Sequence, residues 1–217
     1  IRQTITYTIT PKVLGGLACA GPSVVVVISI DPVPVVSSAA TKSICSGVSV
    51  NYVPTAAVAG TVFNWTSSVT VGTVTGNTAV GGLGTIADVL VNTTNVIGTV
   101  RYVITPVANG CSGTPFNVDV TVDPQPTLST VVTPLSQVLC SNTAMVIDVN
   151  SATVPSAGSV VYDYVAVASD VSVTGFTASA INQSLATNIS NLNVLNSSLI
   201  RQTITYTITP KVLGGLA

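Results

Sequence analysis

Residues 4–10 read Thr-Ile-Thr-Tyr-Thr-Ile-Thr, and the same stretch returns as residues 203–209. Apolar and polar side chains alternate along it, so an extended strand places Ile5, Tyr7 and Ile9 on one face and the threonines on the other. β-Branched residues fit a pleated surface and are mildly unfavourable in a helix. We therefore expect an all-β protein with almost no helix.

The alternating stretch belongs to a longer exact repeat. Residues 1–18, IRQTITYTITPKVLGGLA, recur letter for letter as residues 200–217. The offset is 199 residues (200 minus 1), so the chain contains one full period and the start of the next. Repeats of this length are strings of domains rather than short solenoid turns.

A weaker repeat lies inside the period. Asp31–Ser37 (DPVPVVS) resembles Asp123–Ser129 (DPQPTLS), and a Cys-Ser pair follows each of them, at residues 45–46 and 140–141. The period therefore holds two related domains.

The positions of the two repeats along the chain predict where its domains begin and end. Residues 31–123 form a complete domain. Residues 1–30 are the last strands of a preceding domain. Residues 124–217 form a second domain that lacks its last strand, and we expect the next repeat to complete it.

Seven short strands are predicted in the complete domain, separated by turns rich in Gly and Pro. They lie near Val33–Ser37, Val48–Val53, Val62–Ser67, Val69–Val74, Ala87–Asn92, Val100–Thr105 and Phe116–Val122. This number in about 92 residues predicts an immunoglobulin-like β-sandwich. Trp65, the only tryptophan, is expected in the core.

Two Asp-Pro-x-Pro segments mark the expected domain junctions. Proline fixes φ and cannot donate to a strand ladder, so two prolines in three residues predict a stiff, extended connector. The junction residues are Asp31, Pro32 and Pro34 at one site and Asp123, Pro124 and Pro126 at the other.

The four cysteines occupy equivalent places in the two domains. The chain has no histidine and no C-x-x-C spacing, which disfavours zinc. We expect a disulfide between Cys45 and Cys111 within the complete domain. Cys19 and Cys140 are expected to pair between successive repeats or chains. Disulfides imply an oxidising compartment.

Composition argues against most chemistry. The chain has no His, no Glu and seven scattered Asp, so it lacks the usual general bases and facing carboxylates of enzymes. We expect no catalytic residues, no metal site and no cofactor. A net charge of −1 argues against a nucleic-acid partner.

Membrane insertion is not expected either, although the mean hydropathy is +0.68. The longest apolar run, Val24–Ile28, is far shorter than the roughly 20 residues of a spanning helix. Asn-x-Ser/Thr triplets begin at Asn64, Asn92, Asn182, Asn188 and Asn196. Such triplets arise easily by chance in this composition, and none is predicted to carry a glycan.

The segment Tyr102–Pro126, YVITPVANGCSGTPFNVDVTVDPQP, resembles the PKD-like repeats of very large surface proteins of gliding and related Bacteroidota. The resemblance is specific at Ile104–Pro106, Asn109–Cys111 and Gly113–Phe116. The copy around Cys19 keeps Tyr-x-Ile-Thr-Pro and the cysteine but lacks Asn-Gly and Thr-Pro-Phe. The resemblance implies secretion to the cell surface, a role as an adhesin or motility filament, and no catalytic residues.

These observations predict a tandem array of sandwiches that forms a long extracellular fibre or adhesin stalk, for gliding or for surface attachment. Its partners are neighbouring copies of itself, with surface polysaccharide or the substratum as further candidates. Two alternatives stay open at this stage. One is a discrete pilus-like subunit that polymerises by strand addition. The other is a non-catalytic carbohydrate-binding module, which would need an exposed row of aromatic side chains.

Overall fold

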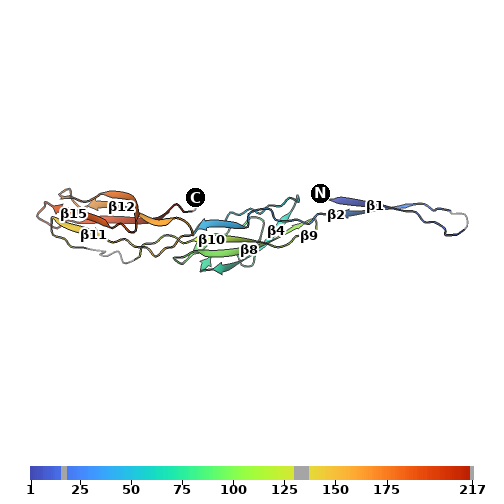
Figure 1. Cartoon of the computed structure of the whole chain (residues 1–217), viewed down its shortest axis with the longest axis horizontal. Coiled ribbons are helices and arrows are strands. Elements are labelled where there is room, and N and C mark those ends of the chain that lie inside the picture. The colour runs from blue at the N-terminus through green and yellow to red at the C-terminus, as the bar shows by residue number, and fades with distance from the viewer. Residues whose placement is uncertain (16–18, 130–136, 216–217) are drawn as a thin grey trace.

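The computed structural model describes residues 1–15, 19–129 and 137–215. Every helix or strand assigned within these ranges is a β-strand, which confirms the all-β prediction. Figure 1 shows three bodies in a row. We call them the hairpin (residues 1–30), the first domain (residues 31–123) and the second domain (residues 124–217).

The strands of each body follow one another along the chain. The hairpin consists of β1 (Gln3–Ile9) and β2 (Val24–Ile30). The first domain contains β3 (Thr41–Cys45), β4 (Val62–Val71), β5 (Val74–Thr75), β6 (Gly82–Leu83), β7 (Val91–Asn92), β8 (Gly98–Ala108), β9 (Cys111–Ser112) and β10 (Phe116–Asp123). The second contains β11 (Thr143–Ile147), β12 (Ser159–Ala168), β13 (Val173–Thr174), β14 (Ser179–Ser184), β15 (Ile189–Asn196) and β16 (Ile204–Leu213).

The main sheet of the first domain is built around β8. Its order is β3-β10-β8-β4-β6, antiparallel except for the parallel pair β3 and β10. Alternate residues of β8 are buried along its whole length, as expected for a strand with one face on a core. Asn109 (φ 50°) and Gly110 (φ 79°) connect β8 to β9, and two positive φ values are what the favoured two-residue hairpin turn requires.

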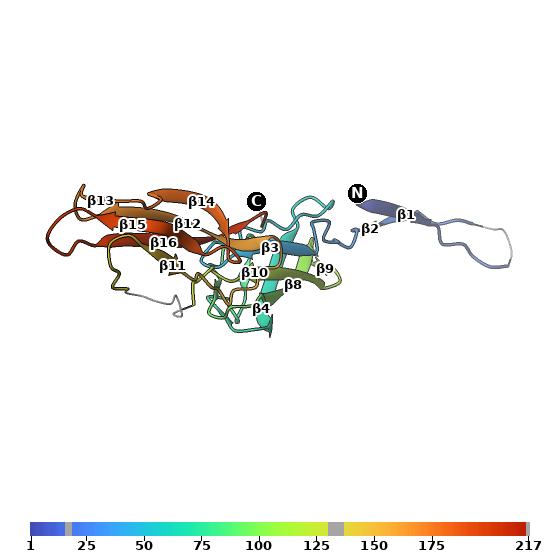
Figure 2. The ribbon, with the colours of Figure 1, turned by 60° about the vertical axis from the view of Figure 1, so that its left-hand side comes forward.

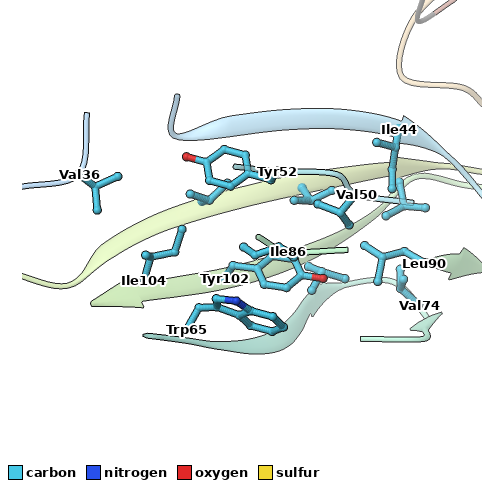
Figure 3. Packing of buried hydrophobic residues seen from close by; sticks show 14 residues of the cluster. Val36, Ile44, Val50, Tyr52, Trp65, Val74, Ile86, Leu90, Tyr102 and Ile104 are labelled. Carbon is cyan, nitrogen blue, oxygen red and sulfur yellow. The ribbon is translucent and has the colours of Figure 1, made fainter. Parts of the chain in front are cut away.

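A second layer covers the inner face of this sheet. It contains β5 paired with β7, and the bridges Ser49–Val89 and Tyr52–Ile86 join two further segments. Between the layers Trp65 meets Tyr102 edge-on, with ring centroids 5.5 Å apart (Figure 3). The core residues are Val36, Ile44, Val50, Tyr52, Trp65, Val74, Ile86, Leu90, Val100, Tyr102, Ile104, Val118, Val120 and Val122. The immunoglobulin-like sandwich and the core position of Trp65 are as predicted.

Individual strands differ from the prediction in several places. The predicted strand Val33–Ser37 makes only the isolated bridge Val36–Ala56, and of the predicted strand Ala87–Asn92 only Val91–Asn92 forms a named strand, β7. β3 was not predicted, because only Ile44 of its five residues is a buried apolar residue. The segment Val48–Val53 makes isolated bridges rather than a continuous strand. The predicted strands Val62–Ser67 and Val69–Val74 are largely one strand, β4, in which an irregularity between Val69 and Val71 shifts the register.

The second domain repeats part of this arrangement. β12 pairs with β14 and β16, as β4 pairs with β6 and β8, and a sheet of order β11-β15-β13 faces them. Tyr206 of β16 lies opposite Ala166 as Tyr102 lies opposite Ser67, so Tyr164 takes the place of Trp65. The buried core is smaller: Met145, Val149, Tyr162, Tyr164 and Ile189.

The hairpin corresponds to β8 and β10 without the rest of a domain. Tyr7 pairs with Val26 as Tyr102 pairs with Val118. Residues that lie directly opposite one another in a strand pair point to the same face of the sheet. On this face of the hairpin all the apolar side chains are exposed, namely Ile5, Tyr7, Ile9, Val24, Val26, Ile28 and Ile30. Figure 2 shows the hairpin projecting away from the first domain. These side chains therefore have no second layer against which to pack among the described residues.

Equivalent valines in the first domain and the hairpin should differ in their contribution to stability. We expect Val118→Ala to lower the free energy of unfolding of the first domain by about 2 kcal/mol, because Val118 is fully buried. Val26→Ala, at the equivalent but 41% exposed position, should leave it unchanged. Urea unfolding followed by fluorescence measures this domain alone, since Trp65 is the only tryptophan. Equal losses in the two variants would contradict the assignment.

Candidate functional site

The junction between the first and second domains is a hydrogen-bonded contact. Asp123 is 5% exposed, and its two carboxylate oxygens accept hydrogen bonds from the backbone N (2.7 Å) and the Oγ (2.9 Å) of Ser156. The backbone N of Val154 also donates to the carbonyl of Asn95 at 2.7 Å. A buried carboxylate is costly to leave without donors, so these bonds hold the second domain against the end of the first.

The prolines of the two Asp-Pro-x-Pro segments also pack against the domains. Pro124 is buried beside Asp123, and Pro34 is among the most buried side chains of the chain. A Cβ at Gly113 would lie 2.0 Å from the carbonyl oxygen of Pro34, so the β9–β10 connection requires glycine there to pass the Asp-Pro-x-Pro segment. Pro32 and Pro126 are partly buried. The predicted connectors are therefore packed parts of the domains.

At the other junction the aspartate has a different partner. Asp31 accepts hydrogen bonds from Nε and Nη2 of Arg2, at 2.7 and 2.8 Å. This two-pronged pair ties the start of β1 to the end of β2, and the Arg2 guanidinium lowers the pKa of the Asp31 carboxyl. Arg201 has the same sequence neighbours as Arg2, but it forms no ion pair among the described residues.

In both domains the hydroxyl of the central tyrosine is hydrogen-bonded to a polar side chain, as the donor in the first domain and as the acceptor in the second. The hydroxyl of Tyr102 donates to Asp88 at 2.8 Å, and Asp88 accepts from the backbone N and Oγ1 of Thr78. Burial raises the pKa of Tyr102. In the second domain Asn191 replaces the aspartate: it contacts the Tyr206 hydroxyl at 3.2 Å and accepts from Thr177. This network was not predicted from the sequence, because the polar residue changes type between the copies.

A second shared feature is an asparagine at the sheet end. Asn92 Oδ1 accepts from the backbone N and Oγ1 of Thr94, and its Nδ2 donates to the carbonyls of Val96 (2.7 Å) and Val122 (2.9 Å). Asn92 thus ties the loop after β7 to the last residues of β10. The Asn-x-Thr triplet signals this turn.

Asn196 repeats the turn with one bond fewer. Its Oδ1 accepts from the backbone N and Oγ of Ser198, and its Nδ2 donates to the carbonyl of Ile200 at 2.9 Å. Among the described residues no counterpart of the Val122 carbonyl is in reach. The missing acceptor is the one that β10 supplies in the first domain.

The outer edge of β16 is correspondingly unpaired. β16 pairs with β12 on one side, and no described strand pairs with its other side, where β10 flanks β8. The described segment Gln137–Cys140, which corresponds to β3 through the shared Cys-Ser, forms no strand. We call this unpaired side of β16 the β16 edge.

An apolar cleft opens beside the β16 edge. Its volume is about 1020 Å³, and its lining includes Leu128, Leu139, Met145, Val194, Tyr206 and Ile208. Tyr206 and Ile208 are only partly buried, whereas their counterparts Tyr102 and Ile104 are fully buried. The second domain therefore leaves apolar surface open where the first is closed.

Both domains match a known family. A model described as a PKD-like domain matches residues 42–126 and again residues 137–216. The two matches cover well over half of the chain. The chain belongs to the PKD-like domain family. A search of the curated proteins finds no match.

Neither PKD-like domain gathers the residues of a reactive centre within the described parts of the chain. No three His, Cys, Asp or Glu side chains come together there as metal ligands would. No helix in those parts could span a membrane. Immunoglobulin-type domains of the PKD-like kind are typically non-catalytic, and the Asp123, Asp88, Asn92, Asn191 and Asn196 side chains are engaged in holding strands or domains together.

The cysteines do not bring the predicted partners together. All four are free thiols in this structure. Cys45 ends β3 opposite Asp123, the last residue of β10, whereas Cys111 precedes Phe116, the first residue of β10. Seven strand steps separate these ends by roughly 23 Å. The predicted Cys45–Cys111 bridge is therefore corrected: a disulfide needs Cα atoms within about 7 Å. The pairing of Cys19 with Cys140 stays a prediction.

Removing the junction carboxylate should loosen the two PKD-like domains. We expect Asp123→Ala to broaden their relative orientations, because Ser156 loses both hydrogen bonds to the carboxylate. Small-angle X-ray scattering should show a shift in the distance distribution of the chain, and the second domain should lose about 1–2 kcal/mol of stability. The control is Asp170→Ala, because the Asp170 carboxylate accepts from the backbone N of Ser172 in its own turn and from no other described residue. Identical scattering curves for the two variants would contradict a junction role.

The pair across β8 and β10 should make the first domain sensitive to acid. Arg101 Nε and Nη2 donate to the two oxygens of Asp119, both at 2.8 Å, and the Arg101 guanidinium lowers the pKa of Asp119. A carboxyl with a lowered folded-state pKa contributes stability that is complete above its unfolded pKa of about 3.9 and is lost as the pH falls below it.

We therefore expect the free energy of unfolding, followed by Trp65 fluorescence, to fall between about pH 4 and pH 2. In Asp119→Asn the fall over the same interval should be smaller. An acid dependence equal to that of the unchanged chain would show that this pair does not contribute.

Proposed function

We propose that this chain is a structural repeat unit of a long extracellular surface fibre or adhesin stalk, in gliding motility or surface attachment. One observation carries the proposal. The same strand occurs twice along one axis, as β1 in the hairpin before the first domain and as β16 inside the second domain (Figure 1). Because the strand that begins one period recurs at the start of the next, the same arrangement of domains can be repeated along the axis in both directions.

The hydrogen bonds and buried prolines at the junctions support a role in resisting tension or in spacing. The Asp123–Ser156 bonds and the buried prolines fix the domains end to end, so each added period lengthens the fibre along the same axis. Tandem domains joined in this way behave as a quasi-one-dimensional array. Membership of the PKD-like family fits a structural extracellular repeat. Cell-surface location and self-association are parts of the proposal.

The geometry gives less support to a carbohydrate-binding module. Such a module needs aromatic rings exposed in a row, but Trp65, Tyr52, Tyr102, Tyr162 and Tyr164 are all buried. The exposed Tyr7 stands on the face of the hairpin whose counterpart is buried in the first domain, at Tyr102, and partly buried in the second, at Tyr206. Among the aromatic residues that the structure describes, Tyr7 is the exposed one, so these residues form no row of exposed rings.

The mass of the native material tests the proposal. We expect a denaturing gel of cell-surface material to show a species far heavier than 21.8 kDa, with or without reductant, because a continuous chain of repeats is covalent through its backbone. Antibodies against the first domain identify the band.

A band near 21.8 kDa after reduction would contradict the continuous array and would favour discrete subunits. If such subunits run as a ladder without reductant, an intermolecular Cys19–Cys140 bridge explains the ladder. Reduction therefore separates the two architectures in a single experiment.

A further inference from the structure

We infer that the β16 edge is the receptor for one specific strand, the Val24–Ile30 strand of the following copy of the repeat. This inference rests on the proposed array and adds the contact by which one copy joins the next. Four features of the described residues point to this occupant.

The first feature is pairing already seen with the same sequence. β1 and β16 share the stretch Ile-Thr-Tyr-Thr-Ile, and in the hairpin β1 pairs with Val24–Ile30 over seven residues. The same register on β16 places Val26 of the incoming strand opposite Tyr206. It also places Val24 opposite Ile208 and Ile28 opposite Ile204.

The second feature is the shape of the completed domain. In the first domain β10 occupies the corresponding position, and its Val118, Val120 and Val122 are fully buried. The equivalent residues of the incoming strand are Val26, Ile28 and Ile30, which are 41%, 46% and 50% exposed in the hairpin. The exposed apolar side chains of the incoming strand would pack against the apolar side chains that line the cleft beside the β16 edge. Burial of both surfaces is favourable.

The third feature is a set of polar groups that the incoming strand would satisfy. Asn92 Nδ2 donates to the Val122 carbonyl in the first domain, and the Asn196 amide has the matching position for the carbonyl of the incoming Ile30. Arg201 has the matching position for the incoming Asp31, as Arg2 has for Asp31 in the hairpin.

The fourth feature is the other wall of the receptor. In the first domain β10 lies between β8 and β3, and β3 pairs with it in parallel. The counterpart of β3 includes Gln137–Cys140, where Val138 is 78% exposed and Leu139 packs against the second core. An incoming strand would give this segment the backbone partner that β10 gives β3.

The direction of the strand also fits the array. β16 runs toward the junction with the first domain, because Leu213 pairs with Ser159 near the Ser156 contact. An antiparallel strand on its edge runs back and leaves at the opposite end of the second domain. The Asp31-Pro32 junction of the following copy then begins there, in line with the preceding domains.

The test uses the full chain with residues 19–31 appended again after Ala217. We expect amide hydrogen exchange along β16 to slow by about tenfold or more relative to the unextended chain, and the thermal midpoint of the second domain to rise by about 5 °C or more. Exchange is best measured by NMR, because β1 and β16 yield identical peptides. The Asn196 side-chain amide provides a separate signal, since it should gain an acceptor only when the strand is seated.

Matched substitutions in the appended segment distinguish a seated strand from loose hydrophobic contact. In the expected register the side chain of Val26 faces the core, so Val26→Asp should abolish the protection of the β16 amides against exchange. Val27→Asp points outward at the position that Asp119 occupies in the first domain, and should preserve the protection. Equal effects of the two substitutions, or no protection in the extended chain, would overturn the inference.

Two further outcomes identify the source of the strand. The unextended chain should stay monomeric over a concentration series in analytical ultracentrifugation, because its own Val24–Ile30 is paired with β1. Self-association with protection of β16 would overturn the assignment to the following copy in line, and would assign the strand to a separate chain. If the extended chain shows no protection of β16 while the native species is very heavy, this contact is refuted and the proposed fibre is retained.

Discussion

The structure depends on one constraint: the strand that carries the central tyrosine needs a backbone partner on each side. In the first domain β8 has β4 on one side and β10 on the other, and every inward residue of β8 is buried. In the second domain the one described strand that pairs with β16 is β12, and Tyr206 and Ile208 are partly exposed beside a cleft. In the hairpin β1 pairs with β2, and within the described parts of the chain no second layer covers them. Related strands are thus seen in three settings, and the strand is most buried where it has a partner on each side and a facing layer.

Polar contacts reinforce this constraint at defined points. The Tyr102–Asp88 and Tyr206–Asn191 contacts fix the central strand to the opposite layer in each domain. Asn92 ties the last strand to a loop, and Asp123 ties one domain to the next. With charged residues at only 6% of the chain, few ion pairs are available, so stability rests on packed valines and on these buried hydrogen bonds. Stability that rests on packing and buried hydrogen bonds is consistent with the proposed role as a structural repeat unit.

The duplicated strand links the fold to the proposed function. A sandwich that takes its last strand from the following copy joins neighbouring units through backbone pairing as well as through a connector. Pulling on such a fibre loads a whole strand ladder in each domain rather than a single flexible linker. The Asp-Pro-x-Pro segments, packed into the domains at Pro34 and Pro124, then transmit force instead of absorbing it.

The sequence by itself determined the all-β class, the two related domains and the core position of Trp65, because alternation, exact repetition and turn residues are local signals. It also indicated the Asp-Pro junctions. It did not show β3, whose pattern contains a single buried apolar residue, or the pairing of Asp88 and Asn191 with the tyrosines, since those residues differ in type. Nor could it place the cysteines: equivalent positions in two domains suggested the Cys45–Cys111 bridge, but strand direction puts these residues at opposite ends of a sheet. Only the tertiary structure decided these points, because they depend on which strands become neighbours and in which direction they run, and the alternation of side chains is the same in either direction.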